Sequence, residues 1–217
     1  MAVFPLLDHV LFPGTTMPLR ILEERYALML RDILDNHWPL AVALVTPQEH
    51  ARPGDDGEFF LNTICGAGPV EILKEYNDGR KDIFVHGRTR VKLHEFIQKE
   101  PYFIMEASLL ETSDLAVPKA VRRITAFDDF RELVKTWVFL NPLIEEREAL
   151  IFNQFEAPGE LTDFFVFHYL KRALDKQGYL NCLDATLRAE MLTEFLKTDL
   201  RRLSRKLGQT EKSRLIH

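Results

Sequence analysis

Apolar residues follow two different periodicities along the chain. From residue 3 to about residue 110, short apolar runs alternate with polar positions and are separated by proline, glycine and Asx residues, a pattern typical of strands and turns. From about residue 118 onward, apolar residues recur at steps of three and four, which predicts helices. We therefore expect an α+β protein, with a β-rich lobe at 1–113 followed by a helical bundle at 118–217.

The first lobe contains one predicted helix among its strands. Residues 23–36 have helical spacing, and residues 40–45 form an apolar run of strand length. Strand regions at 60–75 and 81–97 flank Asn77-Asp78-Gly79, which predicts a hairpin, and a further strand is expected at 102–110. Five to seven strands in 110 residues suggest a small closed or half-closed barrel. Within it, Gly66-Ala67-Gly68 is interpreted as a tight turn or a strand irregularity.

The second lobe predicts four helices. They are expected at about 118–141, 142–155, 160–175 and 184–207. Gly178 is expected to break the third helix, and Asp184 is a suitable N-cap for the last. His168 lies among aromatic residues of the third helix, so we expect a hydrogen-bonded core histidine.

Composition indicates a globular protein of the cytoplasm. Hydrophobic residues make up 46% and charged residues 28%, which argues against disorder. The longest apolar run, Pro39–Val45, is much shorter than the roughly 18 residues of a membrane span, and no secretory signal is expected at the start. Cys65 and Cys182 are far apart and are expected to be reduced thiols.

Charge is distributed unevenly along the chain. Residues 1–115 carry 11 Lys and Arg against 18 Asp and Glu, while residues 116–217 carry 17 against 15. The last 21 residues hold seven basic side chains and two acidic ones. Such a basic segment is either a solvated helix face or a contact surface for nucleic acid or an acidic partner.

Motifs that would indicate catalysis are absent from the sequence. There is no phosphate-binding loop and no nucleophile elbow, and the four serines lie in no activating context. His86, His94 and Cys65 lack the spacing of a zinc site and are interpreted as ordinary strand residues. We therefore predict no catalytic residue, metal or cofactor, and no enzymatic activity.

The candidate binding residues are Phe59 and Phe60. They end a long polar segment, Thr46 to Glu58, that has no periodicity, and segments of this kind are often functional. Two consecutive aromatic residues at its end are candidates for a protein-binding surface. Phe60 as the first inward residue of a strand is the alternative.

Several blocks of the sequence, in order, resemble one known family. The first block is Val3-Phe4-Pro5-Leu6, Val10-Leu11-Phe12-Pro13-Gly14 and Met17-Pro18-Leu19-Arg20-Ile21-Leu22-Glu23. The central blocks are Gly68-Pro69-Val70-Glu71-Ile72-Leu73 and Val85-His86-Gly87-Arg88-Thr89-Arg90-Val91. The late blocks are Ala157-Pro158-Gly159-Glu160-Leu161-Thr162-Asp163 and Leu183-Asp184-Ala185-Thr186-Leu187-Arg188-Ala189-Glu190-Met191-Leu192. Together they resemble the N-terminal substrate-recognition domain of ATP-dependent Lon proteases in a stand-alone form.

This resemblance implies a barrel related to PUA domains, packed with a helical bundle, and a role in holding other polypeptides. The ATPase and the Ser–Lys peptidase of a Lon protease have no counterpart in the 217 residues. The family defines no short catalytic motif in this region, so no residue is assigned a role from it. The expected partners are unfolded or extended polypeptides, with a separate ATPase or protease as a further partner.

A second hypothesis is RNA binding, in which the barrel cooperates with the basic last helix. Arg201, Arg202, Arg205 and Lys206 would contact phosphates, although the acidic first half opposes this. Salt separates the two hypotheses, because RNA binding falls steeply with ionic strength and apolar peptide binding does not. The last helix also suggests weak self-association through Leu196, Leu200, Leu203 and Leu207.

Overall fold

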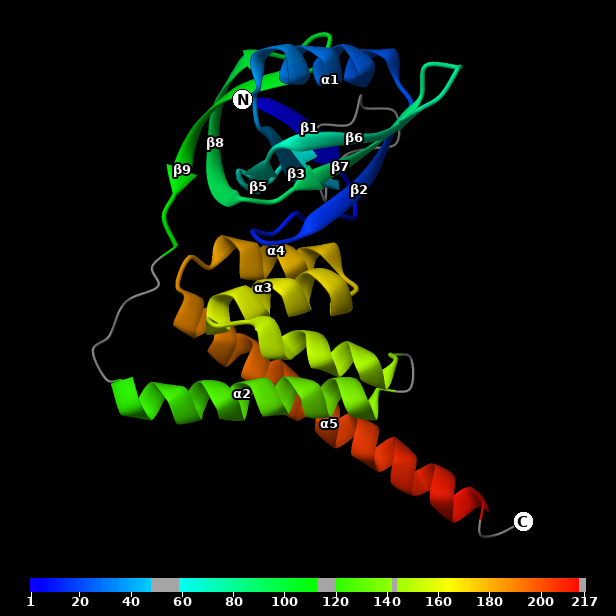
Figure 1. Ribbon diagram of the computed structural model, residues 1–217, viewed down its shortest axis with the longest axis vertical. Coiled ribbons are helices and arrows are strands. Elements are labelled where there is room, and N and C mark those ends of the chain that lie inside the picture. Colours follow the sequence, from blue (N-terminus) through cyan, green and yellow to red (C-terminus); the bar gives the residue numbers. More distant parts are fainter. Residues whose placement is uncertain (48–58, 113–119, 142–143, 215–217) are drawn as a thin grey trace. The chain divides into compact units, whose positions relative to one another are not determined.

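The computed structural model describes residues 1–47, 59–112, 120–141 and 144–214 (Figure 1). Contacts between residues divide the chain into two compact units. Unit 1 comprises Met1–Thr112 and Asp163–Leu183, and unit 2 comprises Ser113–Thr162 and Asp184–His217. The predicted lobes were 1–113 and 118–217, so all helices after residue 118 were expected in one lobe. In the structure, residues 163–183 contact strands of unit 1 instead. The boundaries of independently folding domains stay a prediction.

Five strands of unit 1 close into a barrel, as predicted. They are β1 (Ala2–Leu6), β3 (Leu40–Pro47), β5 (Ile64–Gly68), β8 (Thr89–Gln98) and β9 (Phe103–Leu110). Neighbours in the order β1-β9-β8-β5-β3 are antiparallel, and parallel pairing of β1 with β3 closes the barrel, from Ala2 opposite Leu40 to Leu6 opposite Leu44. A short strand, β4 (Phe59–Leu61), pairs with the end of β3 and extends the sheet.

Alternating side chains of the barrel strands form two separate cores. All five strands contribute to one cluster, which must therefore fill the barrel, and its members are Val3, Ala41, Ala43, Cys65, Ala67, Val91, Leu93 and Met105. Small residues predominate there because the interior of a five-stranded barrel is narrow. The intervening positions, such as Phe4 and Val42, point outward into the second core.

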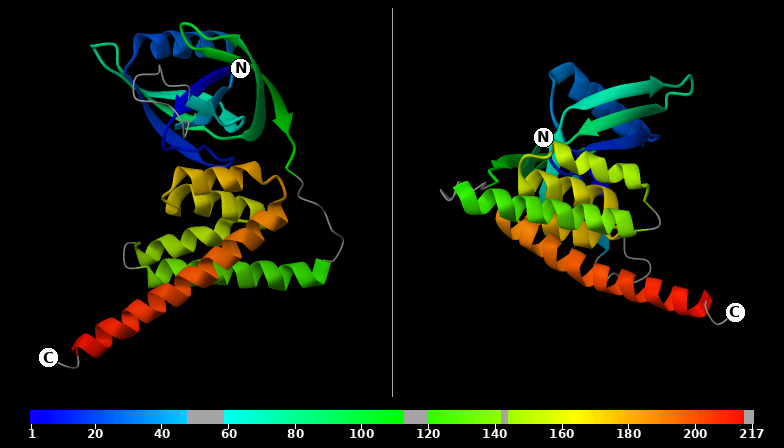
Figure 2. Two further views of the ribbon diagram at one scale, coloured as in Figure 1. Left: turned by 180° about the vertical axis from the view of Figure 1, so that it is seen from behind. Right: turned by 60° about the horizontal axis from the view of Figure 1, so that its bottom comes forward.

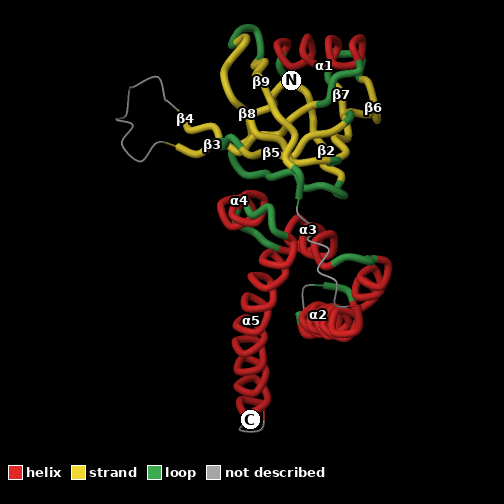
Figure 3. Tube along the Cα trace, turned by 90° about the vertical axis from the view of Figure 1, so that its left-hand side faces the viewer, coloured by secondary structure: helices red, strands yellow, loops and turns green. Residues whose placement is uncertain are grey.

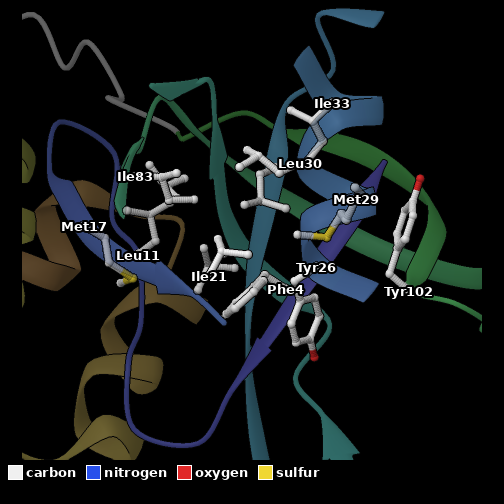
Figure 4. Packing of buried hydrophobic residues seen from close by; sticks show 14 residues of the cluster. Phe4, Leu11, Met17, Ile21, Tyr26, Met29, Leu30, Ile33, Ile83 and Tyr102 are labelled. Carbon is white, nitrogen blue, oxygen red and sulfur yellow. The ribbon is translucent and has the colours of Figure 1, made fainter. Parts of the chain in front are cut away.

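The second core lies between the barrel wall, a three-stranded sheet and one helix. The sheet has the order β2-β7-β6, formed by β2 (Thr16–Ile21), β6 (Val70–Glu75) and β7 (Lys81–His86), and the helix is α1 (Glu24–Asn36). The core they enclose contains Phe4, Leu11, Met17, Ile21, Tyr26, Met29, Leu30, Ile33, Ile83 and Tyr102 (Figure 4). The predicted hairpin is confirmed, since β6 and β7 are joined at Asn77–Gly79 and Gly79 has φ of 86°.

Gly66 and Gly68 form neither the predicted turn nor the predicted strand irregularity. Both lie in the regular strand β5, which pairs with β3 and β8 without a register shift. A Cβ atom on Gly66 would lie 2.1 Å from the carbonyl oxygen of Leu11, and one on Gly68 would lie 1.8 Å from that of His86. These glycines therefore allow two other backbone segments to cross close to the strand.

The predicted third helix is two helices in the structure. The first is α3 (Pro158–Tyr169) and the second is α4 (Ala173–Asn181). Arg172, with an extended backbone, is the N-cap residue of α4 and separates the two helices. Gly178 was expected to break a helix but lies inside α4, where burial of Tyr179 and Leu180 compensates for its low helix propensity of about 1 kcal/mol. The expectation of a core histidine was also wrong: His168 is exposed, with its ring 4.2 Å from that of Phe164.

Unit 2 is built on two long helices, α2 (Ala120–Leu140) and α5 (Ala185–Arg214), which cross each other (Figure 2). Asp184 caps α5 as predicted, since its Oδ1 accepts hydrogen bonds from the backbone N–H of Thr186 and of Leu187. The segment expected as an α-helix at 142–155 is a 3-10 helix, η1 (Glu146–Gln154). α5 continues past the predicted end at residue 207 and is uninterrupted (Figure 3).

Candidate functional site

The sequence candidates Phe59 and Phe60 lie on the edge strand β4. Phe60 is opposite Thr46 of β3, and 64% of its surface is exposed. The next residue, Leu61, packs against the barrel interior. Phe60 therefore points outward, which settles the alternative of an inward Phe60. Phe59 pairs through its backbone with Pro47, and its side chain lies outside the described residues.

β4 is the last strand in the order of its sheet. On its inner side it is held to β3, where Asn62 donates hydrogen bonds to the carbonyl oxygen of Leu44 from both its backbone N–H and its Nδ2. On its outer side no strand follows among the described residues. An edge strand can pair with an extended chain, and the exposed Phe60 offers that chain an apolar contact. Residues 48–58 of the predicted long loop lie outside the described residues.

A second exposed apolar set in unit 1 was not predicted as a site. Phe96 and Ile97 of β8 are 42% and 69% exposed, where the pairing of β8 with β9 is irregular. The ring centroids of Phe96 and Phe103 lie 5.3 Å apart, and Nζ of Lys99 lies 5.0 Å from the ring centroid of Phe96. A signal was present in the sequence, because Phe96 falls on the same face of the alternating strand as Lys92 and His94.

A buried ion pair joins α3 to the barrel within unit 1. Arg90 of β8 is 1% exposed and donates from Nη2 to Oδ1 of Asp163, at 2.8 Å, and from Nε to the carbonyl oxygen of Leu180. Its guanidinium also lies 5.9 Å from the ring centroid of Phe12. These charges are enclosed by protein and cannot reach a substrate, so the pair positions elements and performs no chemistry.

Reactive side chains do not converge in the described residues. Burial raises the pKa of the Cys65 thiol to about 12, which keeps it protonated and unreactive at neutral pH. Nε2 of His86 lies 2.9 Å from Oε2 of Glu71, and Nε2 of His94 lies 2.9 Å from Oγ of Ser108, so the two histidines have separate partners. Within the described parts of the chain, no three potential metal ligands come together.

The candidate residues for the alternative, RNA binding, lie on α5. Arg201, Arg202 and Arg205 are exposed, and the side chain of Lys206 lies outside the described residues. Leu196, predicted to take part in self-association, is fully buried within the protein and is not available. Leu200 and Leu203 are half-buried, and the side chain of Leu207 is not among those described. No described helix is long and apolar enough to cross a membrane.

Most of the chain matches the profile of one protein family. Residues 1–198 match the profile of the ATP-dependent protease La (LON) substrate-binding domain. The chain belongs to this family. The matched LON substrate-binding region includes Phe60, Phe96 and Arg90, and also the first part of α5, up to Thr198.

Relatives of this LON domain chain are Lon proteases. Those of Azospirillum brasilense and Desulfosudis oleivorans are each 26% identical to it, over 90% and 98% of its length. The chain spans about a quarter of the length of these relatives, 24% and 25%. The parts of those proteins outside the matched region have no counterpart in the 217 residues.

Solved structures of LON domains share the fold. A Lon N-terminal domain protein from Xanthomonas campestris has a TM-score of 0.58 and 20% identity, with 88% of this chain and 95% of that one covered. The N-terminal domain of the Mycobacterium avium complex Lon protease has a TM-score of 0.62 and 17% identity, with 90% and 97% covered. The predicted barrel with following helices is thereby confirmed.

Proposed function

We propose that the chain is a non-catalytic module that binds unfolded or extended polypeptides along the edge strand β4. Membership of the LON substrate-binding family carries the proposal, and the exposed Phe60, on an edge where no further strand follows among the described residues, supports the location. An extended segment would add its backbone to β4 and place apolar side chains against Phe60 and its neighbour Phe59. A separate ATPase or protease would receive the bound polypeptide.

The experiment measures binding of a permanently unfolded protein, reduced and carboxymethylated α-lactalbumin, by fluorescence anisotropy. The double variant Phe59→Ser/Phe60→Ser should weaken binding at least about fivefold, because apolar contacts at the centre of an interface dominate affinity. The control is Leu109→Ser, since Leu109 is also apolar and 72% exposed but lies on β9. Unchanged affinity in the double variant would remove the proposed location.

A parallel pair of substitutions examines the second apolar set. If β4 is the binding site, Phe96→Ser and Ile97→Ser should leave the affinity close to that of the wild type. If the binding surface lies on β8 instead, these two substitutions should weaken binding, and the Phe59→Ser/Phe60→Ser variant should bind as the wild type does. Raising the salt concentration from about 50 to 200 mM should change polypeptide binding little, whereas RNA binding would fall by orders of magnitude. Salt-labile binding of RNA together with no binding of the unfolded protein would favour the alternative function.

A further inference from the structure

We propose that one face of α5 binds an amphipathic polypeptide segment whose apolar residues are followed by carboxylates. The first part of this face, called here the apolar stripe, consists of Leu187, Met191 and Phe195. They recur every four residues and so lie along one side of the helix, and they are 48%, 37% and 39% exposed. The opposite side of the same turns is buried, with Leu192 and Leu196 fully covered.

Further along the helix, the exposed side is basic. Thr198, Arg201, Arg202 and Arg205 border one open depression of the surface. Arg202 is held by Asp199, which also accepts a hydrogen bond from Nε1 of Trp137. Arg201 and Arg205 make no ion pair with another described residue, so these two guanidinium groups can bind the carboxylates of a partner.

The spacing of the two parts sets the length of the partner. Met191 and Arg201 are ten residues apart, or about 15 Å at 1.5 Å per helical residue. A helical segment of about 20 residues covers both parts, with apolar side chains at one end and Asp or Glu at the other. An amphipathic segment in this order has both the shape and the charge of the face.

A second copy of this chain fits the face less well. Consider two α5 helices packed antiparallel about a two-fold axis. Glu190 then reaches Arg205 of the second copy, and Glu194 reaches Arg201, in one register only. That register places Met191 opposite Ser204. The charges are then paired, but Met191 faces a serine, and of these two stripe residues only Phe195 faces an apolar residue, Leu200. Sliding the helices until the two apolar stripes meet brings the Glu190 and Glu194 side chains of both copies together, which is unfavourable.

RNA fits only half of the face. Phosphates would bind Arg201 and Arg205, but Leu187 and Met191 provide neither the positive charge that phosphates need nor the aromatic ring on which bases stack. A polypeptide uses both parts. This surface belongs to unit 2, whereas Phe60 belongs to unit 1, so the inference goes beyond the proposed function and can fail or succeed separately from it.

The test uses the full chain and a fluorescein-labelled synthetic helical peptide of about 20 residues, with leucines on one face of its first half and glutamates on that face of its second half. Anisotropy should show saturable binding to the wild type. Arg201→Glu/Arg205→Glu should lower the affinity at least about tenfold, because it places like charges together. The same variant should bind a peptide with lysine in place of glutamate better than the wild type does.

Two more variants complete the design. Leu187→Ser/Met191→Ser should also weaken binding, whereas Arg147→Glu, a charge reversal at an 81% exposed side chain of η1, should not. Phe59→Ser/Phe60→Ser should leave the affinity for this peptide unchanged, which separates the α5 surface from the β4 edge. Thermal unfolding of each variant checks that it is folded.

Three results would overturn the inference. The first is loss of peptide binding in Arg201→Glu/Arg205→Glu but not in Leu187→Ser/Met191→Ser, together with equally effective displacement of the peptide by a single-stranded oligouridylate. This result would indicate an anion site only. The second is a wild-type dimer in sedimentation velocity that becomes a monomer in Arg201→Glu/Arg205→Glu, with no peptide binding by either. The third is equal affinity for the glutamate and lysine peptides.

Discussion

Arg90 and Asp163 are 73 positions apart in sequence, yet Nη2 of Arg90 lies 2.8 Å from Oδ1 of Asp163. The side chains are 1% and 5% exposed, so the two charges are almost completely removed from water. Nε of the same guanidinium donates to the carbonyl oxygen of Leu180 at the end of α4. One barrel residue therefore holds both α3 and α4, and this contact explains why Asp163–Leu183 groups with the strands.

Removing one partner of this pair should destabilise the protein strongly. Asp163→Ala leaves the Arg90 charge buried without its carboxylate, and we expect a loss of about 3–5 kcal/mol in the free energy of unfolding. The measurement is urea-induced unfolding followed by circular dichroism. Arg90→Met/Asp163→Leu should cost less than Asp163→Ala alone, because no uncompensated charge remains. Arg88→Met, at an exposed neighbour, is the control, and a loss below about 1 kcal/mol in Asp163→Ala would contradict this explanation.

Alanine should have opposite effects at two glycines. Gly66→Ala places a methyl group against the backbone of Leu11 and should be destabilising by more than about 2 kcal/mol, because the clash is with main-chain atoms that cannot move away. Gly178→Ala meets nothing within 4 Å inside a helix and should be stabilising by about 0.5–1 kcal/mol. Thermal and urea unfolding of both variants measure the difference. Equal effects would show that β5 can shift away from Leu11.

The stability of unit 1 should decrease at alkaline pH through Cys65. Burial raises the pKa of this thiol from 9.0 to about 12, so above pH 9 the unfolded state releases a proton that the folded state retains. The contribution is fully present below pH 9, and it is lost as the pH rises toward 12, by at most about 1.4 kcal/mol per pH unit. Burial also raises the pKa of Tyr179 to about 12, with a similar effect above pH 10.

Unfolding of the wild type and of Cys65→Ala at pH 8, 9, 10 and 11 isolates the thiol, because Tyr179 is common to both proteins. The wild type should lose more stability than the variant between pH 9 and 11. Parallel curves for the two proteins would show that the thiol ionises in the folded state.

Asp184 should contribute to the stability of unit 2 through its cap. Its Oδ1 accepts hydrogen bonds from the N–H of Thr186, at 2.8 Å, and of Leu187, at 3.0 Å. Asp184→Ala should lower the free energy of unfolding by about 1 kcal/mol, and Asp184→Asn should lower it much less, since Asn is also a good cap. Circular dichroism at 222 nm during unfolding measures both, and an equal loss in the two variants would argue for a charge effect instead.

Features that depend on near neighbours were predictable. The hairpin at Asn77–Gly79, the helix at Glu24–Asn36 and the cap at Asp184 each follow from a few consecutive residues. Phe60 as a surface residue was one of two open alternatives, and it was decided only by the pairing of β4 with β3. His168 was misplaced because aromatic neighbours on its own helix resemble a core from the sequence, but here its ring is exposed and tilted against the half-buried ring of Phe164.

The sequence by itself determined the class of each half and the family, because hydrophobic periodicity, turn residues and ordered blocks are local properties. Only the tertiary structure decided that β1 pairs in parallel with β3, that Gly66 and Gly68 lie under crossing segments, and that Arg90 joins α3 to the barrel. Each of these depends on two segments far apart in the chain. A close approach or a buried ion pair exists only once both partners are in place, so neither partner carries a sign of it among its own neighbours.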